Sequence, residues 1–286
     1  MQEVIAVRRV GPIGLLGVLV LVLAGCSGAS APVPVAPAAT TVATPTPTPT
    51  PGQVRALPVY YASQTPSGLR LYREFHRVTT VDPVSDAVRE LFTAPLDPDY
   101  RTLWPSGVAL RAPVTSEAGV TTVDLYGVDG TRVAADAAPF AVQQLVLTVQ
   151  GARQSTDPVR VLVDGRAVNT LWTVPATAPI ARGDVYALRS LVQIDDPAQG
   201  ATVGRDVVVS GEAAVFEATV HWEVLRGSAV VRSGVASSAE GQKFAPYRFT
   251  ITLEPGQYTV RVREDDPSDG AGRPVLTDDK AFTVGG

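Results

Sequence analysis

The sequence predicts an α+β domain followed by an all-β sandwich. The first observation is that helical and alternating hydrophobic periods are mixed between residues 54 and 170. The second is that helical periods vanish after about residue 150, and seven short strand-like runs separated by turns follow from about residue 190. The third is the composition, with 45% hydrophobic and 18% charged residues, which is typical of a globular chain. The 286 residues suffice for two domains of ordinary size.

The N-terminus, residues 1–25, has the features of a signal peptide. An uncharged apolar run follows Arg8 and Arg9 and ends in Leu-Ala-Gly-Cys at residues 23–26. The run is shorter than the ~20 apolar residues of a membrane span, but it suits the hydrophobic part of a signal peptide. Its end resembles a bacterial lipobox, which implies cleavage between Gly25 and Cys26 and a diacylglycerol on the Cys26 thiol. The alternative is an uncleaved anchor helix, which we disfavour because the chain's one cysteine falls at this position.

A linker is expected over residues 26–53. It is built mainly from Ala, Pro, Thr, Val and Ser, and it contains the run Thr-Pro-Thr-Pro-Thr-Pro at residues 46–51. Proline fixes φ and removes hydrogen-bond donors, so the segment favours extended polyproline II at ~3.1 Å per residue. We therefore expect a stalk or tether of about 75 Å at full extension between the bilayer and the folded domains.

The elements of residues 54–170 are expected in the order ββαββαβ, with two helices on one face of a mostly antiparallel sheet. The first helix begins at Asp82-Pro83, a helix cap followed by a first-turn proline. Apolar residues at i, i+3, i+4, i+7 and i+8 give it one buried stripe. The second helix is expected to stop at Gly151. The expected strands are 59–62, 69–76, 108–114, 120–125 and 159–163, and the expected helices are 83–92 and 142–150.

These residues together resemble the GerMN domain, first described in spore-germination proteins. The resemblance implies interaction rather than chemistry, because the family has no catalytic motif to transfer and related folds build assemblies at membranes. It covers nearly the whole segment and depends on the order and spacing of several motifs: the strand at 59–61, the helix at 83–92 with a Pro-rich loop, Trp-Pro-Ser-Gly-Val at 104–108, Thr-Val-Asp-Leu at 122–125, and the runs 141–148 and 159–165.

Residues 188–286 are expected to form the β-sandwich. Tyr258 follows Glu-Pro-Gly-Gln and resembles a tyrosine corner, whose phenol bonds to nearby main chain. Trp222 lies on the third strand and is placed to fill the core between the sheets. The expected strands are 190–194, 206–211, 217–225, 229–236, 247–253, 257–264 and 276–284.

This segment resembles the immunoglobulin-like domain that accompanies GerMN in bacterial proteins. Residues 171–187, which contain several Pro and Gly residues, are expected to be a short interdomain connection, and we expect the two domains to fold independently. The resemblance is carried by Pro-Ala-Gln-Gly at 197–200, Val-Ser-Gly-Glu-Ala at 209–213, Phe-Glu-Ala at 216–218, Pro-Gly-Gln-Tyr at 255–258 and the acidic turn at 264–270.

Composition excludes several kinds of chemistry. One cysteine and two histidines leave no basis for disulfide scaffolds, thiol redox pairs or Cys/His zinc sites. With 24 basic and 28 acidic side chains, the net charge of −4 gives no basic excess to bind nucleic acid. Asp265, Asp266, Asp269 and Gly270 could supply oxygen ligands to calcium, but the spacing of a calcium loop is missing and a solvated turn is favoured. We expect no metal and no cofactor.

Three further groups of side chains could carry a function, and for each we compare that interpretation with a structural one. His76, beside Glu74, could act as a base, although we expect it on a polar surface, and we expect His221 on the outer face of the sandwich. Tyr60, Tyr61 and Tyr72 could stack on sugars, but strands ordinarily carry tyrosine, so core packing is favoured. Carboxylates could support glycoside hydrolysis, but no spacing selects a pair among Glu74, Asp82, Asp86, Glu90 and Asp124.

The sequence therefore predicts a non-enzymatic lipoprotein, attached through Cys26 to the outer face of the cytoplasmic membrane. Its expected role is to scaffold or regulate an envelope complex through protein–protein interaction, with an envelope or membrane protein as partner or with another copy of itself. The resemblances suggest sporulation or germination as the setting, while other envelope processes stay open. The alternatives are a cell-wall glycan-binding protein and, less favoured, an envelope hydrolase.

Overall fold

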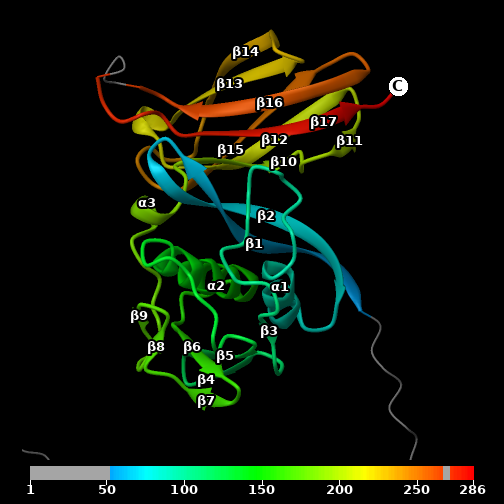
Figure 1. Ribbon diagram of the computed structural model, residues 1–286. Helices are drawn as coiled ribbons and strands as arrows, with labels where there is room; N and C mark the ends of the chain where they lie inside the picture. Colours follow the sequence, from blue (N-terminus) through cyan, green and yellow to red (C-terminus); the bar gives the residue numbers. More distant parts are fainter. Residues whose placement is uncertain (1–51, 267–270) are drawn as a thin grey trace, which may run out of the picture. The chain divides into compact units, whose positions relative to one another are not determined.

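A long β-hairpin is the first element of the described residues (Figure 1). The computed structural model describes residues 52–266 and 271–286. Strands β1 (Gln53–Thr65) and β2 (Gly68–Thr80) pair antiparallel along their whole length. Both strands extend well beyond the alternating runs in the sequence, because exposed residues at the open end of β1 pair with the end of β2. At the turn, the Thr65 hydroxyl donates to the carbonyl of Gly68 at 2.7 Å.

Helix α1 (Pro83–Leu91) begins where the sequence predicts. A carboxylate oxygen of Asp82 accepts a hydrogen bond from the backbone N–H of Ser85 at 3.2 Å, which satisfies one of the free donors of the first turn. Proline follows the cap, where its missing N–H costs nothing. The buried stripe contains Ala87, Val88 and Leu91.

Helix α2 (Ala138–Arg153) runs through the glycine that was expected to stop it. It ends instead at Gln154, which adopts the left-handed conformation with φ 55°. Gly151 has a packing role, because a Cβ atom at this position would lie only 3.1 Å from the ring of Pro58 on β1. The glycine therefore permits a close approach of helix and strand. Helices α1 and α2 pack against each other and against β1 (Figure 1).

A second small sheet completes the first domain, and it is separate from the β1–β2 hairpin. Its central strands run parallel, joined by α2, while the other pairs are antiparallel. The expected strand over 108–114 is interrupted, and the residues on either side of the interruption both pair with β5. Pro113 lies in the break, where a residue without an N–H cannot continue a ladder. The strands are β3 (Ala109–Leu110), β4 (Thr115–Glu117), β5 (Val120–Tyr126), β6 (Val159–Val163) and β7 (Arg166–Ala167).

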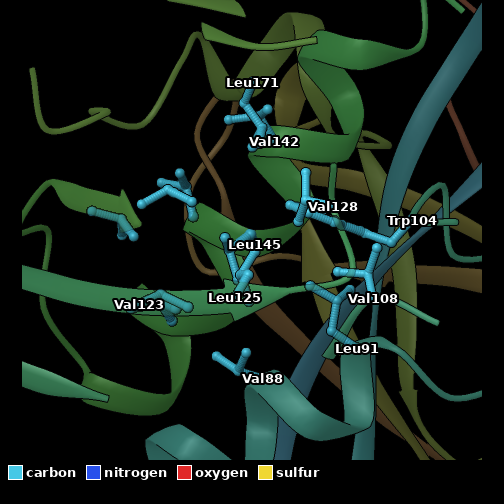
Figure 2. Packing of buried hydrophobic residues seen from close by; sticks show 14 of the residues in the cluster. Val88, Leu91, Trp104, Val108, Val123, Leu125, Val128, Val142, Leu145 and Leu171 are labelled. Carbon is cyan, nitrogen blue, oxygen red and sulfur yellow. The ribbon is translucent and has the colours of Figure 1, made fainter. Parts of the chain in front are cut away.

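One hydrophobic core joins the hairpin, both helices and strands β5 and β6. Figure 2 shows side chains from α1, β5 and α2 in this core, with Leu125 of β5 beside Leu145 of α2. The Trp104 indole N–H donates to the carbonyl of Ala141 on α2 at 2.9 Å, so its polar atom is satisfied inside the core. The α+β class predicted for this domain is confirmed, although its sheet is divided into two.

The expected interdomain connection packs onto the first core. The segment contains strands β8 (Thr170–Leu171) and β9 (Val174–Pro175) and the short helix α3 (Val185–Leu188). Leu171 is fully buried in the core, and Ile180 exchanges two backbone hydrogen bonds with Val159 of β6, at 2.7 and 2.9 Å. Residues 171–180 are therefore held against the first domain rather than lying free.

The second domain is a sandwich of two sheets with a core of its own, and the predicted all-β class is confirmed. The first sheet has the order β10 (Val192–Asp196), β12 (Asp206–Ala213) and β15 (Ala245–Thr252). The second has the order β11 (Ala201–Val203), β17 (Thr277–Val284), β16 (Gly256–Glu264), β13 (Thr219–Arg226) and β14 (Ala229–Ser237). Each of the seven expected strands is present, with one short 3₁₀ turn at Phe216–Ala218. Strand β11 was not predicted, because three residues are too few to show alternation.

Candidate functional site

Two of the predicted sites lie partly or wholly outside the described residues. Cys26 is outside them, and so are Asp269 and Gly270 of the acidic turn. Asp265, at the start of that turn, contacts His221 at 3.1 Å between the carboxylate oxygen and Nε2. Among residues 52–266 and 271–286, no group of three or more His, Cys, Asp or Glu side chains is arranged to hold a metal ion.

The two aromatic residues singled out in the sandwich both contact its core. The Tyr258 hydroxyl donates to the carbonyl of Glu254 at 3.0 Å. Trp222 is only partly buried and stacks on Phe249, with ring centroids 4.9 Å apart. Its ring lies over Gly234 of the neighbouring strand, where a Cβ atom would come within 2.4 Å of the indole. Both residues therefore pack within the sandwich.

His76 is buried, which corrects the expectation that it lies on a polar surface. Its side chain is 7% exposed and lies between two carboxylates. Nδ1 is 2.7 Å from Glu90 Oε2 on α1, and Nε2 is 3.1 Å from Glu74 Oε2 on β2. Glu74 also accepts the backbone N–H groups of Leu96 and Asp97, at 3.0 and 2.8 Å. The chain thus brings together a pair of glutamates that no sequence spacing selected.

This arrangement favours the protonated form of His76 and gives the side chain a structural role. Burial favours the neutral ring, but hydrogen bonds to Glu74 and Glu90 outweigh it and raise the pKa of His76 above its usual value. An ionised carboxylate can only accept, so a ring that faces one at each nitrogen donates from both. A general base needs a free nitrogen lone pair within reach of substrate. His76 offers neither a free nitrogen nor an exposed ring, and it links the hairpin to α1.

A second buried cluster surrounds Lys280, where the two domains meet within one compact unit. Its ammonium is 2.6 Å from Asp97 Oδ2 and 2.6 Å from the Tyr100 hydroxyl, both in the first domain. It is also 3.2 Å from Asp278 Oδ1 on its own strand. The Tyr100 hydroxyl donates to Asp278 at 2.5 Å, and Asp278 accepts the backbone N–H of Ile194 at 2.6 Å. The side chains of Lys280, Asp97 and Asp278 are each 3% exposed.

Burial and charge oppose each other in this cluster. Burial lowers the pKa of the Lys280 ammonium, but Asp278 and Asp97 outweigh it, so that pKa is raised and the side chain stays charged. Burial also raises the pKa of Asp278, despite the nearby ammonium. Burial and the Asp278 charge together hold the pKa of Tyr100 well above its usual value, so its hydroxyl keeps its proton and can donate.

A third group of charges continues the same interface. Arg73 on β2 makes a bidentate contact with Asp195, at 2.6 and 3.2 Å, and also reaches Glu212 on β12 at 3.1 Å. Glu212 is shared with Arg189, at 2.7 Å. Burial works to raise the pKa of Glu212, but the two guanidinium groups outweigh it and lower that pKa below its usual value. These ion pairs join β2 of the first domain to the first sheet of the sandwich.

The alternation of β17 is a signal in the sequence for the Lys280 cluster. Asp278, Lys280, Phe282 and Val284 alternate along β17, and all four are buried. Charged residues at inward positions of an alternating strand require buried partners. Neither Asp97 nor Tyr100 can be identified as that partner without the tertiary structure, because each lies about 180 residues away in the chain.

The fold and its buried interface define a two-domain protein, an α+β domain joined firmly to a β-sandwich. Residues 58–169 match the family described as "Sporulation and spore germination". Residues 191–271 match the family described as "Immunoglobulin-like domain of bacterial spore germination". The chain therefore contains the two domain types that its residues resemble, in that order.

Solved structures with similarity to parts of the chain include GerMN domains. The tandem GerMN domains of the sporulation protein GerM from Bacillus subtilis are 18% identical over 46% of this chain, with a TM-score of 0.35. The match spans 45% of that structure, less than half its length. The first GerMN domain of the same protein is 14% identical, with 46% of this chain and 99% of that one covered and a TM-score of 0.35. A putative lipoprotein from Clostridium perfringens is 13% identical, with 48% and 93% covered and a TM-score of 0.32.

A comparison with curated proteins found no match. In the part of the chain that the structure describes, the helices are too short or too polar to span a bilayer.

Proposed function

We propose that this chain is a non-enzymatic, lipid-anchored envelope protein that scaffolds or regulates an envelope complex through protein–protein interaction. We place that complex in sporulation or germination, because both matched families carry that description. Neither description names a catalytic activity. The buried ion pairs support a scaffold, because they hold two binding modules in one fixed arrangement.

The observation that carries the proposal is the free edge of β14. This nine-residue strand ends the five-stranded sheet and pairs on one side, with β13. Val230 and Val235 are 52% and 59% exposed, and Arg232 is its single charged residue. Edge strands of soluble proteins usually carry charges or prolines that block pairing with another chain. An apolar edge of this length suits a partner that adds a strand to the sheet.

Lysine at the edge tests this role. Val235→Lys places a charge where a partner strand would lie, and the exposed position makes folding insensitive to it. We expect this variant to lose the cross-linked complexes formed by the wild type in membranes and to fail to complement a deletion strain. Val54→Lys, at an equally open position on β1 that is 66% exposed, is the matched control and should retain both. Equal behaviour of the two variants would count against the β14 edge as the interaction surface.

The anchor is a separate part of the proposal. It is supported by the position of Cys26 after an uncharged run that ends in small residues. Cys26→Ser removes the acceptor thiol, and we expect the precursor to remain uncleaved and the mature protein to be lost from the membrane fraction. A variant that matures and fractionates with the membrane as the wild type does would refute lipid anchoring.

The three tyrosines suggested as a sugar-stacking surface do not support the glycan-binding alternative. Tyr60, Tyr61 and Tyr72 are 5%, 0% and 2% exposed, so their ring faces are not available for stacking on sugars. The Tyr61 hydroxyl donates to the carbonyl of Glu90, and the Tyr72 hydroxyl donates to the carbonyl of Thr277. All three tyrosines are core residues, and the hydroxyl groups of Tyr61 and Tyr72 are satisfied by backbone.

A further inference from the structure

A cleft of about 400 Å³ lies beside the C-terminal half of α2, away from the β14 edge. Its size falls in the range of small-ligand sites. The residues that line it are mostly polar, and two are arginines while none is acidic; they include Tyr60, Gln150, Ser155, Thr156, Arg182 and Arg189. Such a lining suits a hydrophilic ligand that carries negative charge.

The guanidinium of Arg182 is held in place by the side chain of Gln150. Gln150 is 2% exposed, and its amide nitrogen donates to the carbonyls of Thr156 and Asp157, at 3.2 and 3.0 Å. With the amide orientation set, its oxygen accepts from Arg182 Nε at 2.8 Å. Arg182 is otherwise exposed, and it forms no ion pair with the carboxylates of the described residues. A preorganised guanidinium loses little entropy when it binds a ligand.

Arg189 is a second cation in the lining of the cleft. It is 7% exposed, and its Nη2 donates to Gln193 and Glu212, at 3.1 and 2.7 Å. Its Nε is buried without a partner. Glu212 also contacts Arg73, which makes its bidentate contact with Asp195. A buried guanidinium with an unused donor is costly to maintain, and functional sites are where such costs are commonly found.

We propose that this cleft binds the carboxylate of an acidic sugar. The planar guanidinium of Arg182 matches a carboxylate in two-point geometry, and Arg189 adds positive charge at the cleft wall. The hydroxyl groups of Ser155 and Thr156 suit the hydroxyl and amide groups of a sugar ring. This activity is additional to the scaffold function and does not involve the β14 edge.

The test uses the full mature chain and two sugars that differ by one group. N-acetylmuramic acid carries a lactyl carboxylate that N-acetylglucosamine lacks, so isothermal titration calorimetry with both isolates the contribution of the carboxylate. We expect binding of the acidic sugar alone, weakened at least about tenfold by Arg182→Gln. Arg166→Gln is the control, since Arg166 is an exposed arginine of the same domain that does not line the cleft.

Three results would overturn the proposal. The first is that the acidic sugar does not bind the wild type at millimolar concentration. The second is that both sugars bind alike, or that Arg182→Gln and Arg166→Gln have the same effect. The third is that inorganic phosphate binds as tightly as the sugar and with the same dependence on Arg182, which would make the cleft a general anion site.

Discussion

Replacing Lys280 by methionine should strongly destabilise the chain, because it removes the one cation from a buried group of charges. The ammonium contacts three oxygens, those of Asp97, Tyr100 and Asp278, at 2.6 to 3.2 Å. Methionine fills a similar volume but leaves two carboxylates, each 3% exposed, without a counter-charge. Breaking a buried ion pair in this way costs about 3–5 kcal/mol.

The chain supplies its own control for this experiment. Lys243 is the one other lysine, and its side chain is 70% exposed, with a contact to Glu240 at 3.0 Å. Exposed pairs of this kind are screened by solvent and contribute little, so Lys243→Met should change stability little. Urea unfolding of the mature chain, followed by tryptophan fluorescence, gives the free energy of unfolding for both variants.

The pH dependence of the Lys280→Met effect provides a second check. Burial raises the pKa of Asp278 above its unfolded value, and the loss of the ammonium raises it further. A carboxyl with a raised folded pKa favours the folded state below the unfolded pKa and loses that contribution as the pH rises through the folded pKa. The cost of Lys280→Met should therefore be smaller near pH 4 than at pH 7. Equal costs for the two lysine variants, or a cost that does not change with pH, would refute the reasoning.

Three further predictions concern the rest of the chain. His76→Gln should lower stability most at about pH 6 and progressively less as the pH rises. The raised pKa of His76 gives a contribution to stability that is present below its unfolded pKa and lost above its folded one. A stability difference that is constant with pH in urea unfolding would contradict the cationic ring. Tyr258→Phe should cost about 1 kcal/mol by removing the bond to the Glu254 carbonyl, and an unchanged melting curve would exclude a stabilising role for the phenol. The fragment 188–286 should unfold cooperatively on its own, because all the residues of the sandwich core come from it. It should be less stable than the full chain, because it lacks Asp97 and Tyr100, which contact Lys280. A fragment that circular dichroism shows to be disordered would contradict a domain boundary near residue 188.

Local sequence determined the elements whose stabilising contacts are close in the chain. Asp82 and Pro83 define the start of α1, because the cap bond is made to a residue three positions later. Alternation defines strands such as β12 and β16, because one face of each is buried and a shift of one residue would expose it. The contact of Tyr258 is also close in the chain, since its phenol donates to the main-chain carbonyl of a residue four positions earlier.

Tertiary structure alone decided the features that depend on distant partners. Helix α2 continues through Gly151, which lies close to Pro58, and His76 is buried beside Glu90 on α1. The partners of Lys280 come from a loop of the other domain. A periodic pattern shows which side of a strand or helix is buried, but not what buries it. The amino-acid sequence therefore specified the two domain types, while the ion pairs that join them were fixed only when the chain brought residues from both domains together.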